Sequence, residues 1–371
     1  LAAFAAALIV AGASTGCSGV YFNTTFNAEK AHAQALDMRA KRLRANPDDS
    51  VAVTAEERAR LTRAIAKSSK VLELWPTHPK YAPRAVFRIA QSQYLMEDFG
   101  AAAVKYDEYL RAFPSGEHAP LARVRRAQAL YRDGQELSAR DALEEVFAAA
   151  PVGEVRREAL LLQARMRVDE ASGLEGLALY EQLLADGSVA SPEARLELHW
   201  RAALLAAELG EWERARYHAL SSDAPTVSIR ARYRQKRLAV TALFELGRRA
   251  EGLAEVRAMQ RQRDYRVYRP DLKLLEGIGT ESGDAAAGAG DASRWAEALG
   301  YYREAVRLGP RTPAAAEAWY RIGRRVLDVD NRADSARAFF DSSAAAARSS
   351  LWGERALETA AALRRLADLV A

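Results

Sequence analysis

The chain has 371 residues, of which 49% are hydrophobic and 28% charged, so extensive disorder is excluded. One cysteine and five scattered histidines exclude a disulfide framework and a cysteine-based zinc site. The formal net charge is +5, and about a fifth of the residues are alanine, which favours helices over strands. This composition predicts an all-α protein.

The chain opens with an uncharged, apolar segment over residues 1–16 (LAAFAAALIVAGASTG), which is too short to span a bilayer. The single cysteine, Cys17, follows at once. This arrangement resembles a bacterial lipoprotein signal, in which a lipidated cysteine becomes the mature N-terminus, although Ser14 stands where that family usually has leucine. The resemblance implies a cleaved signal, lipidation of Cys17 and a tether over residues 17–26.

Small residues recur along the chain with a period close to 37 residues. The spacings within the first set are 37, 37 and 39, and a second set follows twelve residues after the first. Two helices approach closely only where side chains are small, so each pair of positions predicts one helical hairpin, and hairpins stack to bury their apolar faces. The two sets are Ala90, Ala127, Ala164 and Ala203, then Ala102, Ala139, Gly176 and Ala215.

The repeat resembles the tetratricopeptide family. Trp319, Ile322 and Gly323 are spaced like its W-x-x-L-G motif, and three segments are similar to its second helix with a terminal proline: Ala64–Pro76, Ala101–Pro114 and Ala298–Pro310. The resemblance implies an all-α, tetratricopeptide-like superhelix of helical hairpins, an α-solenoid. We expect an N-terminal array over residues 27–270 and C-terminal repeats over residues 295–371, with a capping helix from Trp352 to Val370.

Two irregularities interrupt the repeat. Thr54 and Glu57 have the spacing of a capping box, which predicts a helix that begins after Thr54. The second is a Gly- and Ala-rich segment over residues 271–294, centred on Gly277–Asp291, where five glycines predict an irregular, flexible linker.

The segment VYFNTTFNAEK, over residues 20–30, resembles the opening of bacterial outer-membrane repeat lipoproteins, a group that includes the BamD-like assembly factors. This resemblance implies a protein that faces the periplasm from the outer membrane. It also implies protein or peptide partners in the cell envelope and a role in outer-membrane protein assembly.

In the tetratricopeptide family, the first helix of each pair lines a concave groove that holds peptides. Mapped through the repeat, this resemblance implies a set of inward-facing side chains with polar groups for peptide recognition. The alternative is that the tyrosines only pack between neighbouring hairpins. The implied groove residues are Arg84, Phe87, Gln91, Tyr94, Gln128, Tyr131, Arg132 and Arg165.

Positive charge is concentrated between Arg230 and Arg269, where twelve basic residues face four acidic ones. The segment is compatible with a solvated face, with an acidic protein or lipid surface, or with nucleic acid stacked on Tyr233, Tyr265 and Tyr268. The predicted basic surface consists of Arg230, Arg232, Arg234, Lys236, Arg237, Arg261, Arg263 and Arg266.

No catalytic motif stands out, and we expect no enzyme, no cofactor and no metal site. The adjacent Glu144 and Glu145 point to different sides of a helix and cannot share a substrate. The sequence therefore predicts a lipid-anchored interaction scaffold. The alternatives are a periplasmic cell-wall enzyme or its regulatory arm, and a cytoplasmic nucleic-acid-binding repeat protein.

Overall fold

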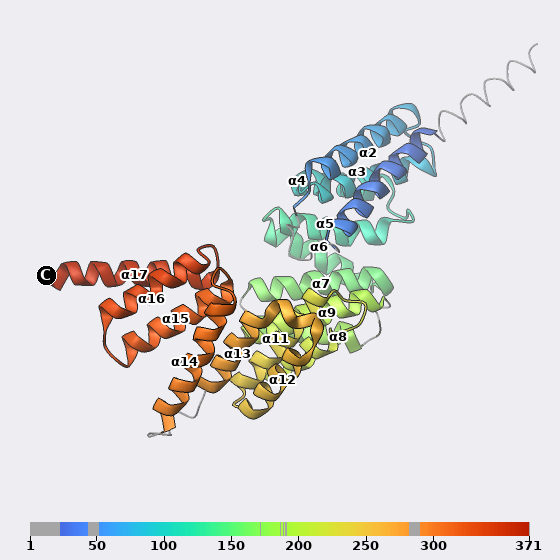
Figure 1. Cartoon of the computed structure of the whole chain (residues 1–371). Coiled ribbons are helices and arrows are strands. Elements are labelled where there is room, and N and C mark those ends of the chain that lie inside the picture. The colour runs from blue at the N-terminus through green and yellow to red at the C-terminus, as the bar shows by residue number, and fades with distance from the viewer. Residues whose placement is uncertain are drawn as a thin grey trace, which may run out of the picture. The chain divides into compact units, whose positions relative to one another are not determined.

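The computed structural model describes residues 23–43, 52–170, 172–185, 187, 189, 191–281 and 290–370 (Figure 1). All regular elements in these ranges are helices, as the sequence predicts, and no strand occurs in them. The chain divides into two compact units, which we call unit 1 (Leu1–Ala194) and unit 2 (Arg195–Ala371). The predicted signal over residues 1–16, the lipidation site Cys17 and most of the tether lie outside the described residues.

Unit 1 begins with helical residues 23–43. Its further helices are α2 (Ala55–Leu74), α3 (Tyr81–Leu95), α4 (Phe99–Ala112), α5 (Ala119–Arg132), α6 (Glu136–Ala148), α7 (Gly153–Asp169) and α8 (Gly173–Ala185). Each of α3, α5 and α7 packs against the helix that follows it. These pairs are the helical hairpins that the repeat predicts.

Unit 2 continues the pattern, and its boundary with unit 1 falls in the first turn of α9 (Pro192–Glu208). Hairpins form between α11 and α12, α13 and α14, and α15 and α16, and α17 packs against α16. The elements after α9 are α10 (Trp212–Ser221), α11 (Ile229–Glu245), α12 (Arg249–Arg261), the 3₁₀ helix η1 (Arg263–Tyr268), α13 (Arg269–Glu281), α14 (Gly290–Leu308), α15 (Pro313–Asp328), α16 (Ala333–Ala346) and α17 (Leu351–Val370). Together the described helices form an all-α array of tetratricopeptide-like hairpins.

The small residues of the repeat lie where the helices of a hairpin cross, as predicted. Every alanine of the two sets is completely buried. A Cβ atom on Gly176 of α8 would lie 2.9 Å from the carbonyl oxygen of Ala164 on α7, which leaves no room for a larger side chain. In α15, a Cβ on Gly323 would likewise lie 2.9 Å from the Phe340 ring of α16. The close approach of backbones therefore fixes the small residues at these positions.

The predicted capping box at the start of α2 is confirmed. The Glu57 amide donates to the Thr54 hydroxyl at 3.3 Å, and the Thr54 amide donates to the Glu57 carboxylate at 3.0 Å. Arg42, on the helix of residues 23–43, donates to the same carboxylate at 3.0 Å. Burial would raise the pKa of Glu57, but these hydrogen bonds outweigh it and lower the pKa. The cap therefore also joins the first two helices.

The predicted irregular linker over residues 271–294 is wrong at both ends. Residues 271–281 belong to α13 and residues 290–294 to α14, and α13 packs against both α12 and α14. A Cβ on Gly277 would collide with the Tyr302 ring, and one on Gly279 would lie 2.5 Å from the Phe244 ring. These glycines permit close packing, which compensates for their poor helix propensity. Residues 282–289 lie outside the described part of the chain.

Candidate functional site

Phe87 is the clearest correction to the predicted groove of unit 1. Its side chain is only 5% exposed and belongs to the core, where it stacks on His118 at 4.6 Å and meets Tyr106 and Tyr109 edge-on. Phe87 is therefore a packing residue and cannot line a binding surface. The repeat spacing placed Phe87 on a first helix. That spacing could not show whether the side chain faces the groove or the neighbouring helices.

The two equivalent amides, Gln91 and Gln128, have different surroundings. Gln91 is half-buried on α3, whereas Gln128 on α5 is 8% exposed and donates to Glu158 of α7 at 3.0 Å. Arg125 of α5 lies 3.5 Å from the same carboxylate. Burial acts to raise the pKa of Glu158, but the neighbouring arginines and hydrogen bonds lower it overall. Gln128 therefore links neighbouring first helices and is not available to a partner.

Tyr94 and Arg132 both contact Phe99, the first residue of α4. The Tyr94 ring lies edge-on to Phe99 at 5.3 Å, and the Arg132 guanidinium lies 4.6 Å from the centre of the same ring. Both residues are half-buried or exposed at the hairpin turns. The contact of Tyr94 with Phe99 therefore agrees better with a packing role than with a side chain that is free to bind a peptide.

The more exposed candidates, which we call the row, lie near the C-terminal ends of α5 and α7, apart from Arg84 in the first turn of α3. Tyr131 donates a hydrogen bond to Asp169, and Arg165 lies 4.0 Å from the same carboxylate. The side chains of Arg165 and Asp169 are both 55% exposed. Arg84, at the start of α3, makes a similar exposed contact with Glu117 at 3.7 Å. The ion pairs of Arg84 and Arg165 are long and exposed, so these two arginines can exchange partners with a bound segment.

Several residues of the predicted basic surface on α11 are paired with carboxylates. Asp223 lies 2.8 Å from Arg232 and 3.6 Å from Lys236, while Arg237 reaches Asp271 of α13 at 2.8 Å. Arg230 is exposed, and Arg234 lies over the Trp200 ring at 5.6 Å. The exposed remainder of the predicted set lies near the α12–η1 junction and consists of Arg261, Arg263 and Arg266.

The three tyrosines of this segment pack against one another. Tyr233 and Tyr268 stack in parallel with their ring centres 3.8 Å apart, and Tyr265 lies 5.6 Å from Tyr233. Tyr233 and Tyr265 are buried. Stacking of nucleic-acid bases on Tyr233 or Tyr265 is therefore excluded, because both rings are buried, and one face of the Tyr268 ring is covered by Tyr233.

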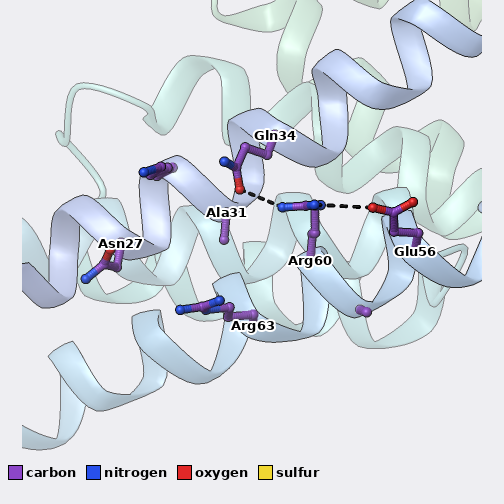
Figure 2. A pocket seen from close by; sticks show the side chains of 8 residues that line it. Asn27, Ala31, Gln34, Glu56, Arg60 and Arg63 are labelled. Carbon is purple, nitrogen blue, oxygen red and sulfur yellow. Dashed lines mark hydrogen bonds and ion pairs between the residues drawn. The ribbon is translucent and has the colours of Figure 1, made fainter.

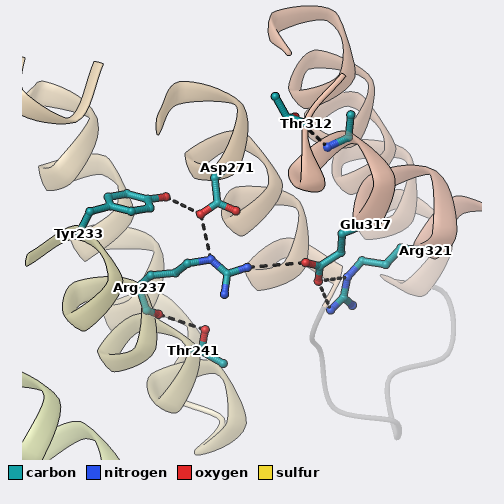
Figure 3. Close-up of polar contacts among 8 residues, drawn as sticks. Tyr233, Arg237, Thr241, Asp271, Thr312, Glu317 and Arg321 are labelled. Carbon is teal, nitrogen blue, oxygen red and sulfur yellow. Dashed lines mark hydrogen bonds and ion pairs between the residues drawn. The ribbon is translucent and has the colours of Figure 1, made fainter. Parts of the chain in front are cut away.

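A continuous polar network joins the first helices of unit 2 (Figure 3). Tyr233 donates to Asp271 at 2.5 Å, and Arg237 lies between Asp271 and Glu317 of α15, at 2.8 and 3.6 Å. Burial acts to lower the pKa of Arg237, but the two carboxylates outweigh it and raise the pKa. Arg321 extends the network from Glu317, at 2.9 Å, toward the end of α13. These groups position α11, α13 and α15.

Each unit has a large open pocket on its described surface. The pocket of unit 1, about 590 Å³ in volume, lies between residues 23–43 and α2 (Figure 2). Arg60 in its wall already donates to Gln34 at 2.8 Å and to Glu56 at 3.2 Å. This leaves Lys30 and Arg63 as the other basic groups of the lining.

The pocket of unit 2, about 550 Å³ in volume, is formed by α12, α13 and α14. We call it the cationic pocket, because its lining contains five basic residues and one carboxylate. The sequence indicates the positive charge of this region, but the predicted basic surface includes only Arg261 among these residues. Arg257 and Arg261 on α12, and Arg269 and Lys273 on α13, are each four residues apart and therefore share a helix face. This spacing was a signal in the sequence for more of the lining residues. The lining consists of Arg257, Gln260, Arg261, Arg269, Lys273, Glu304, Arg307 and Leu308.

Each unit also contains a histidine that is held in its neutral form. His32 lies 3.0 Å from the Ser92 hydroxyl, and burial, assisted by the charge of Arg88, lowers the pKa of His32 to about 4. In unit 2, His199 and His218 face each other with their Nδ1 atoms 3.0 Å apart. Burial, assisted by the charge of the neighbouring His218, lowers the pKa of His199 to about 4.

Metal binding and membrane insertion find no support in the described residues. No cluster of three or more His, Cys, Asp or Glu side chains there has an arrangement that could hold a metal ion. Within the same ranges, no helix has the length and apolar character needed to cross a membrane.

The sequence matches no known family model and no curated protein. Solved structures with a similar fold include the C-terminal part of a TPR repeat-containing protein from Cytophaga hutchinsonii, 13% identical with a TM-score of 0.47 over 74% of this chain and 98% of that chain. Another is a tetratricopeptide repeat protein from Parabacteroides merdae, 13% identical with a TM-score of 0.38 over 76% and 93%.

Proposed function

We propose that the chain is a non-catalytic scaffold that binds segments of partner proteins along the first helices of unit 1. The observation that carries this proposal is the row of exposed, loosely paired polar side chains on α3 and α7. Arg165 and Asp169 lie at the limit of ion-pair distance and are both more than half exposed. Arg84 and Glu117 form the second such pair.

Exchange of these pairs provides a physical route to binding. An exposed ion pair contributes only about 0–1 kcal/mol, so Arg165 can bind a partner carboxylate at little cost while Asp169 keeps its hydrogen bond from Tyr131. The side chains beneath the row are fixed by packing and by the Gln128–Glu158 hydrogen bond, so the backbone need not rearrange. A rigid helical face with exchangeable polar groups suits an extended or helical peptide.

Site-specific photocrosslinking tests this proposal. A photoreactive residue at Arg165 is compared with one at Val104, which is equally accessible on the second helix α4 at 64% exposed. We expect discrete protein adducts from position 165 and none from position 104. Adducts of equal yield at both positions, or none at either, would reject the row as a binding surface.

We propose further that a lipid on Cys17 holds the scaffold at a bacterial outer membrane, facing the periplasm, where it takes part in outer-membrane protein assembly. The support is the resemblance of residues 1–16 and 20–30 to lipoprotein openings. Labelling with a fatty-acid analogue tests the anchor. We expect label on the wild-type chain and none after Cys17→Ser; an unlabelled wild-type chain would contradict the anchor.

A further inference from the structure

We propose that the cationic pocket of unit 2 is a second binding site, and that it takes an extended acidic peptide segment of a partner protein. The pocket is separate from the row on α3, α5 and α7 and involves none of its residues. Failure of this inference therefore leaves the proposed function of unit 1 intact.

Three of the five positive charges of the pocket have no carboxylate partner. Arg257, Arg261 and Arg269 have no carboxylate within ion-pair distance among the described residues, and all three are exposed. Lys273 is paired with Glu276 at 2.6 Å, and Arg307 is paired with Glu304 at 2.6 Å. Three unpaired guanidinium groups around one hollow hold a positive potential that attracts anions.

An uncharged group of the lining also lacks a partner. The amide nitrogen of Gln260 is buried and has no hydrogen-bond acceptor in the described part of the chain. Gln260 lies on α12 between Arg257 and Arg261, in the same wall of the pocket. A buried donor without an acceptor costs free energy, so a side-chain rotation toward a bound carbonyl or carboxylate would be favourable.

The spacing of the basic residues matches an extended chain. Arg257 and Arg261 are four residues apart on α12, and so are Arg269 and Lys273 on α13, which separates the members of each pair by about 6 Å. In an extended peptide, side chains two residues apart lie on one face and about 6.7 Å from each other. Carboxylates at alternate positions can therefore meet successive arginines, with bidentate hydrogen bonds to each guanidinium.

The pocket favours a peptide over other anions. None of its lining residues is aromatic. Tyr233 and Tyr265 are buried, and the half-buried Tyr301 ring already lies 5.3 Å from the Lys273 ammonium, so the lining offers bases no free ring for stacking. The three unpaired arginines come from two helices, Arg257 and Arg261 from α12 and Arg269 from α13, and so offer several separate guanidinium groups to one chain. Leu308 adds an apolar contact for the stem of an acidic side chain.

Fluorescence anisotropy with the full chain tests the site. The probe is a labelled peptide of alternating aspartate and serine, with an all-serine peptide as its neutral control. The test variant is Arg257→Gln with Arg261→Gln, and the matched control is Arg263→Gln with Arg266→Gln, which removes the same charge from exposed positions of η1 outside the lining. Thermal unfolding of each variant verifies that it folds, and Arg269→Gln provides a milder second variant.

We expect the acidic peptide to bind the wild type and the neutral peptide not to bind. The Arg257 and Arg261 double variant should weaken binding by about tenfold or more, the control pair by less than about twofold, and Arg269→Gln by an intermediate factor. Equal losses in the two double variants would contradict a built site, as would absence of binding by the wild type. Tighter binding of a single-stranded oligonucleotide, or displacement of the peptide by inorganic phosphate, would also overturn the proposal.

Discussion

The first helices of the hairpins are connected differently in the two units. In unit 1, the exposed ion pairs are separate from one another: Arg165 and Asp169 are four residues apart on α7, and Arg84 of α3 meets Glu117 in the turn before α5. In unit 2, a continuous network joins α11, α13 and α15, and Glu317 at its centre is only 7% exposed (Figure 3). One repeat architecture thus produces an exchangeable surface in one unit and a fixed internal network in the other.

The difference follows from how charged groups behave in different surroundings. Exposed pairs contribute little and can be replaced by a partner, whereas a buried pair that loses one member leaves a costly unpaired charge. The row of unit 1 is therefore suited to binding, and the network of unit 2 to fixing helix positions. In unit 2, the proposed binding site is instead the cationic pocket, whose lining includes none of the residues of the network.

The largest expected effect comes from removing the central cation of the network. Arg237→Met leaves Asp271 and Glu317 without their arginine, and we expect it to lower the free energy of unfolding by about 2–3 kcal/mol. The matched control is Arg324→Met, whose partner Asp328 is half exposed; here we expect less than about 0.5 kcal/mol. Urea unfolding measures both losses. Equal losses would show that the network stabilises the fold no more than an exposed ion pair does.

The glycines of α13 should give a smaller effect. Gly277→Ala improves helix propensity but brings a Cβ into collision with the Tyr302 ring, and we expect a net loss of about 1–3 kcal/mol. A Cβ added at Gly300 of α14 would meet no other atom within 4 Å, so Gly300→Ala should stabilise by roughly 0.5–1 kcal/mol. Thermal unfolding compares the two, and a stabilising Gly277→Ala would show that the close packing is absent.

The smallest expected effect is a loss of stability in acid. The pKa of His32 is about 4 in the folded chain and about 6.5 when unfolded, so the unfolded chain binds more protons between these values. The contribution of His32 is full above about pH 6.5 and declines toward pH 4, by about 1.4 kcal/mol at about pH 5.5. His199 acts in the same direction in unit 2.

Replacement of the titrating ring checks this effect. His32→Gln keeps a hydrogen-bonding group near Ser92 but cannot titrate, so the unfolding midpoint should depend less on pH than in the wild type. An unchanged pH dependence in His32→Gln would show that other groups account for the loss.

The fold could be predicted from the sequence because its cause is local and repeated. The spacing of Ala90, Ala127 and Ala164 reports where helices cross, and every copy supports the same hairpin. Gly277 and Gly279 misled the prediction because several glycines in one short stretch suggest flexibility. Only the position of Tyr302 and Phe244 in space shows that these glycines make room for rings.

The candidate sites were less predictable, because they depend on pairing between distant residues. Nothing in the sequence shows that Arg237 meets Glu317, or that Gln128 meets Glu158, so these residues could not be separated from accessible ones. Likewise, Arg307 reaches the cationic pocket only because α14 packs against α13. Periodicity places a residue on a helix face, whereas tertiary packing decides which partner it contacts.

Double-mutant cycles provide the most direct test of the contrast between a fixed and an exchangeable row. One cycle pairs Arg237 with Asp271 in unit 2, and the other pairs Arg165 with Asp169 in unit 1, with unfolding free energies measured in urea. We predict a coupling of about 2 kcal/mol for Arg237–Asp271 and less than about 0.5 kcal/mol for Arg165–Asp169. Equal couplings, or a stronger one in unit 1, would contradict the account.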